Sequence, residues 1–167
     1  MGFLGWTLIA IIGVVFVLVK GASSRAEKVQ AARAATQRQI DDIPRQVAKN
    51  KSIHLPILVS VLKDEFSDSD NEVTELSLSD FYDKIGIWIL AYDGGGCKAC
   101  REFVEDGRRF DNGKTYKELV QSEIATVAPP PIAHAAKEDF PKWWDKMDRV
   151  IKFTTEKALA SGYVATS

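Results

Sequence analysis

The pattern of hydrophobic and polar positions divides the chain into three segments. Residues 1–20 are almost continuously apolar, residues 21–52 are polar and rich in alanine, and residues 53–167 carry apolar residues at helical spacing between short polar breaks. Apolar residues three and four positions apart are typical of amphipathic helices. We therefore expect a mainly α fold with a single N-terminal transmembrane helix, a helical juxtamembrane stalk and a small helical soluble domain.

The first 19 residues contain no charged side chain. A helix of this length rises roughly 28 Å, close to the ~30 Å thickness of the hydrocarbon core of a bilayer. A cleaved signal peptide would carry Lys or Arg before its apolar region, and this segment carries neither. The pattern favours a membrane anchor over a signal peptide or a buried soluble helix.

The charge that follows this segment predicts its orientation. Between Lys20 and Lys51 the chain has eight Lys or Arg and three Asp or Glu, although the whole chain has a net charge of -1. Basic residues beside a span stay in the cytoplasm, so we expect a cytoplasmic domain. Lys20, Arg25 and Lys28 are expected to contact anionic lipid head groups. A periplasmic or luminal domain, in which cysteines are commonly oxidised, is the alternative.

Small residues recur every three positions inside the expected span, at Thr7, Ala10 and Gly13. Helices associate in membranes through close packing at small residues. We expect this strip to contact a partner helix, which makes membrane lipid and other membrane subunits or a second copy the expected partners. The nearly neutral net charge argues against non-specific binding of nucleic acid.

Two prolines are expected to interrupt the polar middle of the chain. Pro44 should break the helical stalk, because proline lacks the backbone donor that a helix interior requires. Pro56 should lie near the start of a further helix.

The remaining sequence predicts several helices separated by short breaks. Helices are expected over residues 80–92, 100–110, 115–127 and 139–162, with residues 129–131 as a rigid break. Residues 85–90 also fit a buried strand, but one strand cannot form a sheet. The helical interpretation is therefore favoured.

The two cysteines, Cys97 and Cys100, follow three glycines in the stretch GGGCKAC. If residues 85–93 formed a strand, the order strand, turn, C-x-x-C and helix would resemble the start of a thioredoxin-like fold. This sequence departs from that family at Gly96, which is not aromatic, and between the cysteines, where Lys98 and Ala99 stand. We interpret the pair as two reduced thiols on a helix turn, with a thiol-disulfide role as the alternative.

A metal or cofactor site has little support in the sequence. Structural zinc usually takes four ligands, whereas the chain offers Cys97, Cys100 and two distant histidines, His54 and His134. We predict no cofactor, although a metal shared between the cysteines of two copies is a further option. His134 has no sequence-near acid or nucleophile and is expected in a capping or surface role.

Adjacent tryptophans at 143 and 144 are candidates for partner contact. Neighbouring helix positions point about 100° apart, so one of Trp143 and Trp144 should face the core and the other should face outward. An outward tryptophan is a frequent energetic centre of protein interfaces.

No motif in the sequence fixes a reaction, so the sequence leans against an enzymatic role. An anchor, a stalk and a folded domain favour an accessory, scaffold or assembly subunit of a larger membrane complex. A membrane-tethered thiol-disulfide or metal-binding protein that uses Cys97 and Cys100 is the first alternative. A lysis-associated membrane protein that self-assembles through its span is the second.

Overall fold

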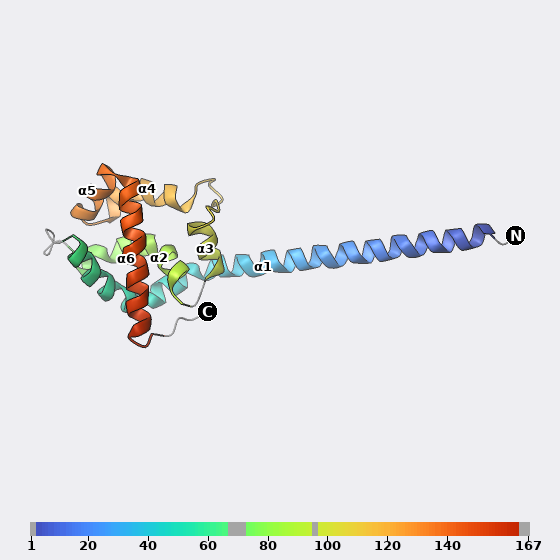
Figure 1. Cartoon of the computed structure of the whole chain (residues 1–167), viewed down its shortest axis with the longest axis horizontal. Helices are drawn as coiled ribbons and strands as arrows, with labels where there is room; N and C mark the ends of the chain where they lie inside the picture. Colours follow the sequence, from blue (N-terminus) through green and yellow to red (C-terminus); the bar gives the residue numbers. More distant parts are fainter. Residues whose placement is uncertain (1–2, 67–72, 95–96, 164–167) are drawn as a thin grey trace. The chain divides into compact units, whose positions relative to one another are not determined.

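The computed structural model describes the backbone of residues 3–66, 73–94 and 97–163, and their side chains from Arg25 onward. These residues form six helices and no β-strand, which confirms a mainly α fold (Figure 1). The helices are α1 (Phe3–Glu65), α2 (Glu75–Tyr92), α3 (Lys98–Val104), α4 (Tyr116–Val127), α5 (Pro130–Glu138) and α6 (Phe140–Ala160).

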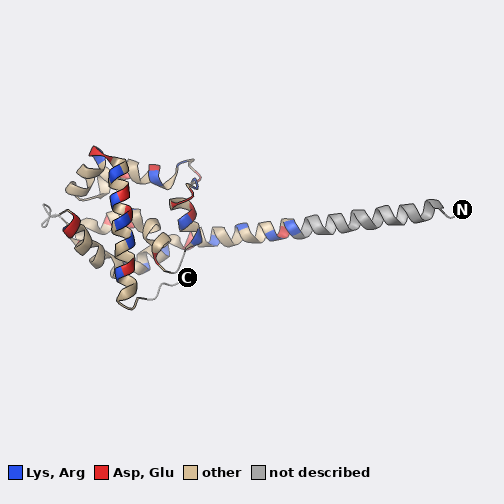
Figure 2. Cartoon of the chain, viewed as in Figure 1, with Lys and Arg blue, Asp and Glu red and all other residues tan. Residues whose placement is uncertain are grey.

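The chain divides into two units, Met1–Gln39 and Ile40–Ser167. In the first unit, the side chains of residues 25–39 are nearly all exposed, and Figure 2 shows Lys and Arg recurring along this part of α1. We expected the stalk to continue to residue 52. The structure instead assigns residues 40–52 to the second unit, where Ile43 and Val47 are buried.

The expected membrane span lies outside the described side chains. This applies to residues 1–20 and so to Thr7, Ala10, Gly13 and Lys20. Among the residues that the structure does describe, no helix combines the length and the apolar character needed to cross a bilayer. The span stays a prediction from the sequence.

Helix α2 lies at the centre of the second unit, where it contacts α3, α4 and α6. Its residues Phe81, Ile85 and Trp88 are fully buried, and a helix that is apolar on most of its surface must be surrounded by other elements. Figure 1 shows α6 passing across α2, with α4 and α5 together at one end of α6. The ambiguous residues 85–90 are therefore helical, because neighbouring helices cover α2 on several sides.

The helix starts follow from capping side chains. Thr74 precedes α2 and forms a capping box with Ser77, while Thr115 precedes α4 and forms one with Glu118. Such side chains satisfy backbone donors that have no partner inside the helix. The expected start of α2 at residue 80 was therefore five residues too late.

The expectations for the prolines were wrong. Pro44 and Pro56 both lie inside α1, although proline in a helix interior costs about 3 kcal/mol. Buried neighbours such as Val47 and Leu58 pack into the core on this stretch, and tertiary packing supplies most helical stability in proteins. The expected break at residues 129–131 instead opens α5, because the first helical turn needs no proline N–H.

Candidate functional site

A disulfide joins Cys97 to Cys100 at the start of α3. Their Cα atoms are 5.2 Å apart, within the range that a disulfide spans. Cys97 is the N-cap residue, and its Sγ accepts a hydrogen bond of 3.3 Å from the backbone N–H of Cys100. The structure thus differs from our interpretation of two reduced thiols, because the first turn of α3 brings the N-cap side chain of Cys97 next to Cys100.

The two sulfur atoms differ in their access to solvent. Cys97 is half-buried, whereas Cys100 is fully buried against the core. A thiolate must reach a disulfide sulfur in order to attack it. An external thiol would therefore attack Cys97 and release Cys100.

A buried polar cluster lies where α2 ends, a few residues before the cysteines. The Asp93 carboxylate, 4% exposed, accepts hydrogen bonds from Asn50 Nδ2 at 3.0 Å and from the Tyr163 hydroxyl at 3.2 Å. Burial, and then the nearby Asp93 carboxylate, raises the pKa of Tyr163 to about 12. The hydroxyl therefore stays protonated at neutral pH and donates to Asp93. These bonds attach both α1 and the segment after α6 to the end of α2.

His54 completes this cluster and is fully buried. Its Nδ1 lies 3.1 Å from the Asn50 carbonyl oxygen, and its ring packs edge-on against Tyr163. Burial lowers the pKa of His54, against the opposing effects of the Asn50 carbonyl and of Asp93. The imidazole is therefore neutral at pH 7, and its Nε2 has no hydrogen-bond partner within the described part of the chain.

A metal site within one chain finds no support in the described residues, which contain no cluster of three or more His, Cys, Asp or Glu. In a disulfide, Cys97 and Cys100 are not thiolates, the form that binds metals. His134 is exposed, and its Nδ1 lies 3.5 Å from Glu138. A metal shared between two copies remains an untested expectation.

The tryptophan pair is divided between the core and its edge. Trp143 is 3% exposed, whereas Trp144 is half-buried and stacks on Trp88 with ring centroids 3.7 Å apart. Lys117 lies over the Trp144 ring at 5.1 Å. Of the two candidates for partner contact, Trp144 therefore keeps the larger exposed surface.

The basic residues expected near lipid lie on the exposed part of α1. Arg25 and Lys28 are both exposed, with Arg33 and Arg38 further along the same helix. These exposed side chains are accessible to an anionic surface such as lipid head groups.

The sequence alone did not indicate the cluster around Asp93. Asn50 and Tyr163 lie 43 and 70 residues from Asp93, so only the fold brings them together. Comparison with protein families, with curated proteins and with solved structures finds no match to this chain.

Proposed function

We propose that this chain is a membrane-anchored accessory or scaffold subunit of a larger membrane protein complex. The observation that carries the proposal is the exposed basic stretch of α1 directly after an uncharged segment of 19 residues. An apolar segment of this length suits a bilayer core, and basic residues beside it suit anionic head groups.

The small-residue strip is the proposed contact within the membrane. Gly13→Leu should release the chain from its complex but leave it in the membrane, because the segment stays apolar and long enough to span. Val15→Leu, on another face of the helix, is the matched control. Crosslinking in the native membrane followed by native-gel analysis tests this, and equal behaviour of the two variants would remove the strip from the interface.

The proposed topology places the folded domain in the cytoplasm, since the basic flank follows the apolar segment. Protease added to intact spheroplasts should then leave the domain uncut. Cleavage while cytoplasmic control proteins stay intact would reverse the orientation.

A second candidate function is favoured by the Cys97–Cys100 disulfide. Disulfides in a reducing cytoplasm are usually transient and catalytic or redox-sensing, so a cytoplasmic domain with this pair fits a tethered thiol-disulfide protein. A thiolate of a partner dithiol would attack Cys97 Sγ, and the bond to Cys100 would break. The second partner thiolate would then displace Cys97, so that two electrons and two protons pass from the partner dithiol to this pair.

Trapping of mixed disulfides distinguishes the two candidate functions. If the pair exchanges disulfides, the Cys97 thiolate of Cys100→Ser should attack an oxidised partner in the reverse of this reaction and accumulate mixed disulfides, because Cys100 is no longer present to displace the partner. Cys97→Ser is the control and should accumulate few, because Cys100 is buried. If neither variant forms mixed disulfides while the complex stays intact, only the accessory role is supported.

A further inference from the structure

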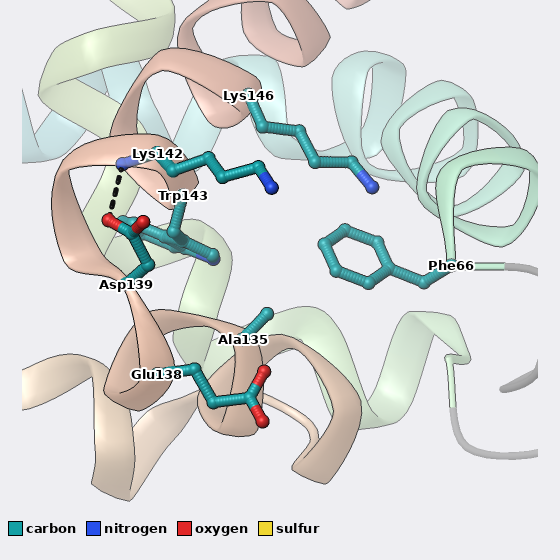
Figure 3. A pocket seen from close by; sticks show the side chains of 7 residues that line it. All are labelled: Phe66, Ala135, Glu138, Asp139, Lys142, Trp143 and Lys146. Carbon is teal, nitrogen blue, oxygen red and sulfur yellow. Dashed lines mark hydrogen bonds between the residues drawn. The ribbon is translucent and has the colours of Figure 1, made fainter.

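A cavity of about 250 Å³ lies between the end of α1 and the junction of α5 with α6. Figure 3 shows its walls: the Phe66 ring on one side, Ala135 below, and Trp143 opposite Phe66. The cavity is close in size to the smaller pockets that bind small molecules. Phe66, Ala135 and Trp143 give the cavity an apolar part, and charged side chains line the rest of it.

The first polar group of the cavity is the indole N–H of Trp143. The Trp143 side chain is 3% exposed, and its Nε1 is buried without a hydrogen-bond partner in the part of the chain that the structure describes. In Figure 3 this nitrogen lies on the side of the ring that faces the cavity. Because buried polar groups nearly always have partners, this donor indicates an acceptor supplied by another molecule.

Two ammonium groups lie on the same wall. Lys142 and Lys146 follow each other on one face of α6, and both side chains extend along the cavity (Figure 3). Lys146 is held in place by the Glu65 carbonyl oxygen at 2.7 Å and by the Phe66 ring, whose centroid is 4.0 Å from Nζ. Its Nζ also pairs with the Glu65 carboxylate at 3.4 Å, which offsets much of its charge, so Lys142 is the main source of positive charge on this wall.

Two carboxylates also line the cavity, Asp139 on the Trp143 side and Glu138 below Ala135 (Figure 3). Asp139 accepts a hydrogen bond of 3.1 Å from the backbone N–H of Lys142 as the N-cap of α6. Glu138 is exposed and points away from both ammonium groups in Figure 3. Glu138 would repel an anion from the Ala135 side, whereas the ammonium groups would attract it to the lysine side.

We propose that this cavity binds a small monocarboxylate with a short apolar chain. The carboxylate accepts from the Trp143 indole and lies beside the Lys142 and Lys146 ammonium groups. The apolar chain lies against Phe66 and Ala135. The same chemistry is present in a free fatty-acid-like carboxylate and in the C-terminus of a peptide that ends in an aliphatic residue.

The test uses the full-length chain labelled with ¹⁵N-tryptophan in detergent micelles. Hexanoate is titrated against its neutral counterpart hexanamide, and acetyl-Ala-Leu with a free carboxylate is titrated against its amide. Both carboxylates should shift the Trp143 indole resonance saturably, and the amides should not. The stronger-binding carboxylate identifies the source, either free or peptide-borne.

Two variants separate binding from folding. Trp143→Phe identifies the indole resonance by its loss. Lys142→Gln changes an exposed side chain, leaves the fold intact and should weaken hexanoate binding about tenfold, because the main positive charge on this wall is lost. Lys157→Gln, on α6 but outside the cavity, is the matched control. Equal shifts with hexanoate and hexanamide, no saturable shift, or unchanged affinity in Lys142→Gln would each overturn the proposal.

Discussion

The indole N–H of Trp88 donates a hydrogen bond of 3.1 Å to the Asp148 carboxylate, which joins α2 to α6 across 60 residues of sequence. The same oxygen accepts a bond of 2.8 Å from the Tyr92 hydroxyl, and Lys152 pairs with the other oxygen at 2.8 Å. Burial alone would raise the pKa of Asp148, but the hydrogen bonds from Lys152, Tyr92 and Trp88 outweigh it and lower the pKa. The ionised carboxylate therefore stabilises the packing of the two longest helices of the domain after α1.

Asp148→Asn should lower the free energy of unfolding by about 1–3 kcal/mol at pH 7, because charged hydrogen bonds are lost. A group whose pKa falls on folding contributes stability above its unfolded pKa and loses it as the pH falls. The difference between wild type and Asp148→Asn should therefore shrink below about pH 4. Urea unfolding at pH 7 and pH 3 measures this. Asp145→Asn, an exposed neighbour on α6, is the control and should change little.

His54 predicts a second pH dependence in a different range. Because burial lowers its pKa in the folded state, the unfolded chain binds a proton more readily as the pH falls below about 6.5. Stability should therefore be complete above this pH and fall as the solution is acidified towards pH 5.

His54→Leu removes the group responsible for that change. The variant should unfold with nearly the same free energy at pH 7 and pH 5, whereas the wild type should lose stability between them. Thermal or urea unfolding at both values measures the difference. His134→Leu is the matched control at an exposed site, and the loss of pH dependence in this control instead would refute the assignment to His54.

The outlines of the fold could be predicted from the sequence where apolar spacing was strong. Residues 115–127 and 139–162 were expected as helices and correspond closely to α4 and α6. Rules that consider only neighbouring residues misplaced other helix boundaries. Proline is unfavourable in a helix interior, but buried neighbours of Pro44 pack into the core and keep it inside α1. The partners of Asp93 and Asp148 were not predictable, since they come from distant positions that only the packed helices bring together.

The disulfide closes a very short loop and should contribute little to stability. The chain-entropy argument gives about 2 kcal/mol for a loop of this size. Reductant should therefore lower the free energy of unfolding by at most this amount and leave the domain folded, as measured by urea unfolding followed by tryptophan fluorescence. The double variant Cys97→Ala/Cys100→Ala should match the reduced wild type and not respond to reductant. Unfolding of the domain on reduction would show that the bond is a structural requirement.

Gly86 is required by the close approach of α1 and α2. A Cβ placed on Gly86 would lie 2.6 Å from Val47 Cγ2 and 3.1 Å from Val47 Cβ. Both Val47 methyl groups lie too close to such a Cβ, so either the Val47 side chain or the two helices must shift. Overpacking of this kind costs about 1–3 kcal/mol, whereas replacing glycine by alanine in a helix gains only about 1 kcal/mol. Gly86→Ala should therefore destabilise the domain.

Val47→Ala provides the test of this mechanism, because it removes both methyl groups that meet the new Cβ. Alone, it should destabilise the domain through the lost packing of a residue that is 7% exposed. Combined with Gly86→Ala, it should cost less than the sum of the two changes, with a coupling of about 1–3 kcal/mol, as expected for residues in contact. Urea unfolding of the four proteins completes the cycle. Strictly additive effects would mean that the two helices already have room for the methyl group and that Gly86 is tolerated there but not needed.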